Sequence, residues 1–183
     1  MNDNYITTFT GRKICPLDPD PEQINIIDIA HHLSNLCRFA GAVIEFYSVA
    51  EHSCRVYDYL KWLGIDDPII LLWALLHDAS EAYLMDLPAP VKHSEEMETY
   101  RQIEKRMMDA ICIKFNIPLT EPEEIYFVDK TLLVTEQRDL MYPGSFVQNG
   151  IKPLQDRIHP WPPVVAKYAM IERLKNMGLE VTK

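Results

Sequence analysis

Two adjacent polar residues, His77 and Asp78, close an apolar run that extends from Ile69 to Leu76. A histidine and an aspartate are costly to bury at the end of so apolar a helix unless something binds them. A metal ion would offset this cost, because imidazole and carboxylate groups are both common ligands of divalent cations. The pair therefore predicts a metal site at the end of a buried helix.

Two further residues of ligand type occupy positions that would face the core. His52 comes three residues after Val49 on a predicted helix, and Asp129 follows Val128 on another. A single inward histidine is usually a hydrogen-bonded core residue. Together with the first pair, however, the four side chains indicate one shared site. Two histidines and two aspartates suit zinc, manganese, iron or cobalt, and side-chain identity does not choose among these metals.

Two more carboxyl groups lie just beyond the first pair. Glu81 comes one helical turn after His77, so it would project near the same site and act as a general acid or base. The alternative is a solvated helix carboxylate. Asp86 precedes Leu87-Pro88, a rigid stop that would hold it over the site, and its alternative role is that of a capping or turn carboxylate.

The pattern of apolar residues is helical, and no stretch alternates convincingly with period two. We predict an all-α fold, with residues 1–183 forming one domain. The chain is predicted to begin with an irregular segment, 1–24, and to contain a Pro/Gly-rich excursion, 142–162, before a C-terminal helix at about 163–177. The other helices are predicted from Asn25 to Gly41, Ser48 to Gly64, Asp67 to Asp78, Ser80 to Met85, Ser94 to Phe115 and Thr120 to Glu136. Thr120 is predicted to form a capping box with Glu123.

Composition narrows the range of functions. The net charge of −9 argues against a general nucleic-acid binder, which needs a basic surface to displace counterions from phosphates. The longest apolar run is too short to span a bilayer. The four cysteines are scattered, so we expect reduced thiols in a cytosolic protein. Phosphate-binding P-loop, dinucleotide-binding and serine-hydrolase motifs are absent from the sequence.

The four candidate ligands match the H…HD…D pattern of the HD-domain metal-dependent phosphohydrolases. Three longer strings are similar to the bacterial 5′-deoxynucleotidases of that family: SVAEHS at 48–53, LHDASEA at 76–82 and DLPAPVK at 86–92. Two N-terminal strings, FTGR at 9–12 and DIAHHLSNLCRF at 28–39, resemble the compact phage members that hydrolyse dATP. The resemblance covers about residues 5–141.

The resemblance implies a helical HD-domain bundle in which His52, His77, Asp78 and Asp129 bind the catalytic metal. This metal would be zinc, cobalt or manganese, and the resemblance leaves open a second ion near Glu81 and Asp86. Glu81 would handle the proton, and Asp86 would assist through that second ion or through a sugar hydroxyl.

The resemblance also assigns the substrate contacts. Arg38 and Phe39 occupy the place of an arginine–aromatic pair that recognises the nucleotide in relatives. Arg38 would bind phosphate or sugar, Phe39 would form an apolar wall for sugar or base, and Lys92 would contact phosphate. The alternatives are an arginine at a helix C-terminus, a core phenylalanine and a solvated lysine. Glu136, with Arg138 and Asp139, is interpreted as part of an ion pair on a helix surface or between helices.

The implied activity is that of a dATP triphosphohydrolase, releasing deoxyadenosine and triphosphate in a phage pathway that replaces adenine by 2-aminoadenine. It would act on a small-molecule deoxynucleotide, without a nucleic-acid polymer or a membrane, as a homo-oligomer in the cytoplasm of the host. Three alternatives stay open: a 5′-deoxynucleotidase acting on monophosphates, a phosphodiesterase for cyclic or signalling nucleotides, and a non-catalytic nucleotide-binding protein.

Overall fold

Side-chain caps determine where several helices of the computed structural model begin. Asn25, Ser48 and Asp67 each accept a hydrogen bond at a side-chain oxygen from a backbone N–H two or three residues on. These bonds satisfy donors that a helix leaves unpaired in its first turn. The caps confirm the three helix starts predicted from the sequence.

The structure describes residues 4–144 and 150–182. Within these ranges the helices and strands, with η marking 3-10 helices, run in this order: β1 (Ile6–Thr7), β2 (Lys13–Ile14), η1 (Pro21–Gln23), α1 (Ile26–Asn35), η2 (Arg38–Gly41), α2 (Val49–Trp62), α3 (Pro68–Leu76), α4 (Glu81–Leu84), α5 (Ala89–Lys92), η3 (Glu95–Met97), α6 (Glu98–Phe115), α7 (Glu123–Leu140) and α8 (Pro163–Asn176).

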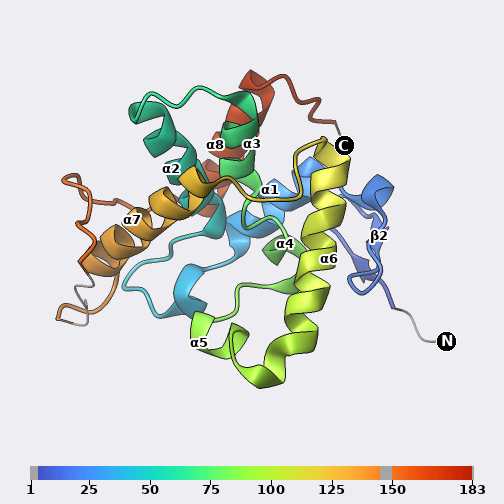
Figure 1. The fold of residues 1–183 in the computed structure, drawn as a ribbon, viewed down its shortest axis with the longest axis horizontal. Coiled ribbons are helices and arrows are strands. Elements are labelled where there is room, and N and C mark those ends of the chain that lie inside the picture. Colours follow the sequence, from blue (N-terminus) through green and yellow to red (C-terminus); the bar gives the residue numbers. More distant parts are fainter. Residues whose placement is uncertain (1–3, 145–149, 183) are drawn as a thin grey trace.

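Helix α2 lies at the centre of the packing. It contacts α1, α3, α7 and α8, while α1 also packs on α8 and α4 (Figure 1). The all-α prediction is confirmed, since the described residues add to the helices only a short antiparallel hairpin in which Ile6 pairs with Ile14. The apolar run of α3 is buried from Leu71 to Leu76, so the end of α3 delivers His77 and Asp78 into the interior.

The first helix ends earlier than predicted. It stops at Asn35 rather than at Gly41, because Leu36 is extended and Cys37 forms a β-bridge with Ser48. The backbone then passes through left-handed conformations at Phe39 (φ 56°) and Ala40 (φ 51°), which are uncommon for residues other than glycine. Arg38 N lies 2.9 Å from Tyr47 O, so Arg38 begins the short η2 turn and does not lie at the C-terminal end of α1.

Other boundaries shift by a few residues. The segment after Ser94 begins as η3, and α6 starts at Glu98. The predicted capping box of Thr120 and Glu123 is wrong: Pro122 occupies the cap position of α7, and no side chain caps this helix. The excursion at 142–162 contains no helix in its described part, although residues 145–149 lie outside the described ranges.

No helix among the described residues has the length and apolarity that crossing a membrane requires.

Candidate metal centre

Two histidine rings face each other where the end of α3 meets α2. His52 Nε2 and His77 Nε2 lie 3.2 Å apart, and His52 is fully buried. The other ring nitrogens are occupied. His52 Nδ1 lies 2.6 Å from Glu136 Oε1, and His77 Nδ1 lies 2.9 Å from Ala74 O. Because a carboxylate and a carbonyl accept hydrogen bonds, both Nδ1 atoms donate, and both Nε2 atoms are left to accept.

Two carboxylates flank the facing nitrogens. Asp129 Oδ1, from α7, lies 3.2 Å from His52 Nε2, and Asp78 Oδ2 lies 3.2 Å from His77 Nε2 and 3.8 Å from His52 Nε2. His52, His77 and Asp129 each offer one ligand atom within 4.8 Å of the others. Asp78 borders this group, and Arg38 also holds it at 3.4 Å.

The donor set fits a divalent cation. Two lone-pair nitrogens cannot remain 3.2 Å apart without a proton or a cation between them. Ligand atoms bound to zinc at roughly 2.0–2.1 Å in a tetrahedron lie about 3.3 Å apart, close to the separations found here. The cluster His52, His77 and Asp129 can therefore hold a metal ion, while nothing in its geometry selects zinc over cobalt or manganese.

The sequence did not reveal that a buried carboxylate, Glu136, supports His52 from the side away from the cavity. Glu136 is fully buried and accepts hydrogen bonds from His52 Nδ1, from Tyr47 Oη at 2.9 Å and from Arg38. Burial would raise the pKa of Glu136, but Arg38 and His52 outweigh burial and lower it to about 2. The interpretation of Glu136 as a partner of Arg138 and Asp139 is thus wrong. Arg138 does pair with Asp139, whereas Glu136 orients His52, a member of the candidate metal cluster.

A cavity of about 380 Å³ opens in front of the centre. Seven of the nine predicted site residues line it, while His52 is buried behind the cavity and His77 faces a neighbouring cavity. The seven are Arg38, Phe39, Asp78, Glu81, Asp86, Lys92 and Asp129. The structure therefore gathers residues from three stretches of the chain (38–39, 78–92 and Asp129) around one cavity.

The predicted substrate contacts already have partners within the protein. Arg38 bridges Asp78 and Glu136, and its guanidinium lies 5.5 Å from the centre of the Phe39 ring. Lys92 pairs with Glu104 at 2.5 Å, and this pairing outweighs burial to raise the pKa of Lys92. A bound phosphate would therefore share Arg38 and Lys92 with carboxylates.

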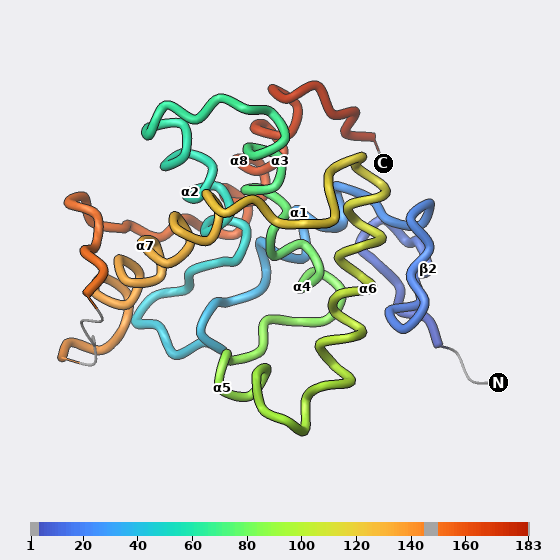
Figure 2. Tube along the Cα trace, viewed as in Figure 1, coloured from blue at the N-terminus to red at the C-terminus, as the bar shows by residue number. Residues whose placement is uncertain are grey.

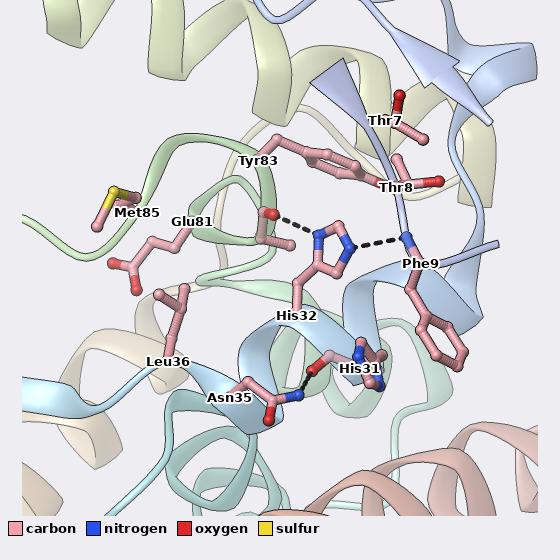
Figure 3. Close-up of a pocket in the computed structure, with 11 residues that line it drawn as sticks. Thr7, Thr8, Phe9, His31, His32, Asn35, Leu36, Glu81, Tyr83 and Met85 are labelled. Carbon is pink, nitrogen blue, oxygen red and sulfur yellow. Dashed lines mark hydrogen bonds between the residues drawn. The ribbon is translucent and has the colours of Figure 1, made fainter. Parts of the chain in front are cut away.

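Glu81 lies where three cavities meet. It lines the cavity in front of the centre, the neighbouring cavity that His77 faces, and a larger cavity of about 570 Å³ (Figure 3). Figure 3 shows how His32 holds the lining of the larger cavity together. His32 Nε2 accepts a hydrogen bond from Phe9 N, and His32 Nδ1 donates one to Ala82 O. Glu81 is 8% exposed, and its Oε2 has no hydrogen-bond partner among the described residues. Such a buried orphan oxygen is a place for a bound water or ligand group.

The buried carboxyl groups differ in charge. Burial, with the negative charges of Asp78 and Asp86, raises the pKa of Glu81 well above its usual range. Burial also raises the pKa of Asp86. Burial would raise the pKa of Asp129, but the contact with His52 outweighs it and holds the pKa below its usual range. The site therefore combines a carboxyl group whose pKa is lowered, Asp129, with two carboxyl groups whose pKa values are raised, Glu81 and Asp86.

Metal binding is expected to strengthen as the pH rises. Burial by itself would lower the pKa of His77 from 6.5, but Asp78 and Asp129 outweigh burial and raise it to about 10. At neutral pH a metal ion must displace this proton. Between about pH 7 and 9 we expect the apparent dissociation constant to fall roughly tenfold per pH unit. Titration calorimetry in buffers of different ionisation enthalpy should detect one proton released from His77 per ion, and a pH-independent affinity would contradict this assignment.

Two curated bacterial proteins are similar to this chain. The uncharacterized protein YfdR of Escherichia coli strain K12 is 35% identical over 144 residues, which cover 78% of this chain and 76% of YfdR. An uncharacterized protein of Rhodobacter capsulatus is 38% identical over 121 residues, which cover 64% of this chain and 61% of that protein. No protein-family model matches the chain. Neither relative's name states an activity, so function has to be argued from the site.

Proposed function

The chain belongs to the family of Escherichia coli YfdR, and for this member we propose metal-dependent hydrolysis of deoxynucleotide phosphoesters by an HD-domain phosphohydrolase. The observation that carries the proposal is the pair of Nε2 atoms of His52 and His77, which lie 3.2 Å apart beside the Asp129 carboxylate while both Nδ1 atoms are bonded elsewhere. The Asp129 carboxylate lines a cavity that Arg38 and Lys92 also line. A cation site next to cationic side chains suits a phosphate ester.

The chemistry divides among the residues present. His52, His77 and Asp129 would hold the cation, with Asp78 at its border. When bound, the cation supplies Lewis acidity that activates water and polarises the phosphoryl group. Arg38 offsets negative charge that develops on the phosphoryl oxygens.

Glu81 is the proton donor in this scheme. Water attacks phosphorus, the bond between phosphorus and the 5′ oxygen breaks, and the Glu81 carboxyl group gives its proton to that leaving oxygen. The raised pKa of Glu81 suits this role, because it favours the protonated form that a general acid needs. The attacking water yields its own proton to solvent, so deoxynucleoside and a phosphate product leave the site.

The leading substrate is dATP, hydrolysed at the α-phosphorus to deoxyadenosine and triphosphate. Support comes from the similarity of the N-terminal strings at 9–12 and 28–39 to phage members of the HD family.

A 5′-deoxynucleotidase is the second candidate, and the charge of the cavity favours it. Besides the proton donor Glu81, the lining holds three carboxyl groups (Asp78, Asp86 and Asp129) against three cations (Arg38, Lys92 and Lys130). This balance suits a phosphate monoester better than a triphosphate chain.

Product analysis tests the proposal and separates the two substrates. Each dNTP and each dNMP is incubated with protein loaded with cobalt, manganese or zinc, and the products are resolved by phosphorus NMR. We expect triphosphate and deoxyadenosine from dATP. Orthophosphate from all dNMPs, with inert dNTPs, would establish the monophosphate activity instead. Hydrolysis of cyclic nucleotides alone, or no hydrolysis together with no bound metal, would overturn the proposal.

A further inference from the structure

Residues 154–161, here called the strap, lie across α7 and α2. Figure 2 shows the orange stretch after α7 running back towards α8. At its beginning, Leu154 N donates to Thr135 Oγ1 at 3.0 Å, and Arg138 donates to the carbonyl oxygens of Leu154 and Asp156. Ile158 N then donates to Asp139 at 2.9 Å. The first half of the strap is therefore fastened to side chains of α7.

The second half of the strap is fastened to α2. Trp161 N donates to Glu51 Oε2 at 2.7 Å, and Arg55 donates to His159 O at 3.0 Å. Arg55 also pairs with Glu51 Oε1 at 2.7 Å, and its guanidinium lies 4.9 Å from the Trp161 ring. Glu51 is fully buried, which is costly for a carboxylate unless its hydrogen bonds are complete. The strap completes them.

The anchoring residues lie next to the metal centre in the sequence. Glu51 directly precedes the ligand His52 on α2, and Thr135 directly precedes Glu136 on α7. The bond from His52 Nδ1 to Glu136 Oε1, at 2.6 Å, joins the same two helices. The strap is therefore hydrogen-bonded to each helix at the residue directly before His52 or Glu136, whose mutual bond orients the His52 ring.

We propose that the strap is a positioning element of the metal centre: through Glu51 and Thr135 it holds α2 against α7 and keeps His52 Nδ1 on Glu136. The proposal rests on the proposed function only in treating His52 as a metal ligand. Groups that act on a ligand through hydrogen bonds typically change metal affinity by about 10- to 100-fold. Because Glu51 and Thr135 act one step further away, we expect about tenfold.

Two isosteric variants test the strap. Glu51→Gln removes the charge that holds Arg55 and the strap, and Thr135→Val removes the acceptor for Leu154 N. In metal-free protein, NMR should show the His52 Nδ1 proton exchanging faster with water in both variants. Cobalt or zinc should bind about tenfold more weakly to each. Thr135→Ser, which keeps the hydroxyl group, should restore both properties.

Asp58→Asn is the matched control. It breaks the pairing of Asp58 with Arg173, which joins α2 to α8 away from the metal centre. It lowers stability but should leave the His52 proton and the metal affinity unchanged. An unaltered His52 proton in Thr135→Val, or an equal loss of metal affinity in Asp58→Asn, would overturn the proposal. If the wild type bound no metal while the His52 proton still responded, the strap would stand and the proposed function would fail.

Discussion

Replacing His77 by alanine is expected to abolish stoichiometric metal binding and to reduce turnover by a factor on the order of 10³ or more. His77 supplies one of two nitrogen ligand atoms, and its Nδ1 hydrogen bond to Ala74 O fixes the direction of the other nitrogen. Losing the cation removes several kcal/mol of charge stabilisation from the transition state. Metal content can be measured by elemental analysis, and turnover on dATP and on each dNMP.

His31→Ala is the control for this variant. His31 stacks on Phe9 at 3.7 Å between ring centres and lies outside both the metal cluster and the cavity in front of it. The control should keep the wild-type metal content and turnover. His77→Ala protein that is folded, as judged by circular dichroism, and still binds one ion per chain would show that the ligands lie elsewhere.

The three residues of the candidate metal cluster could be found from the sequence because each carries its own local signal. A polar pair at the end of an apolar helix, and a histidine or aspartate on an apolar face, are recognisable without any tertiary information. The helix starts were predictable for a similar reason, since Asn25 and Ser48 bond to backbone groups only two or three residues away.

The surroundings of the ligands could not be found in this way. The position of Arg38 depends on the left-handed backbone at Phe39 and Ala40 and on the bridge from Cys37 to Ser48, none of which follows from helical periodicity. Glu136 has the sequence context of an ordinary helix carboxylate. Only the approach of α2 and the Arg38 loop makes it a buried partner of His52.

The second large effect on metal affinity is expected from replacing Glu136, whose side chain is fully buried. Glu136→Gln keeps the shape of the side chain but presents an amide where Arg38 and His52 require a carboxylate. Without the ionised acceptor, His52 loses the bond that fixes its tautomer and ring direction. We expect metal affinity to fall by about 10- to 100-fold.

Glu136→Ala should in addition destabilise the metal-free protein by roughly 3–5 kcal/mol, because among the described residues it leaves the buried Arg38 with only Asp78 as an ion-pair partner. Chemical denaturation measures this change, and chelator competition measures the affinity of Glu136→Gln. Glu98→Gln breaks a mainly exposed pair with Arg101 and is the control, expected to change neither quantity appreciably.

The dependence on pH distinguishes this role from simple packing. The pKa of Glu136 is lowered from 4.5 to about 2 in the folded protein, so its stabilisation is fully present above pH 4.5 and is lost as the pH falls towards 2. Wild-type protein should lose stability across that window, and Glu136→Gln should lose less, since it has no proton to take up there. Equal acid sensitivity of the two proteins would mean that Glu136 does not carry the charge that holds Arg38 and His52 in place.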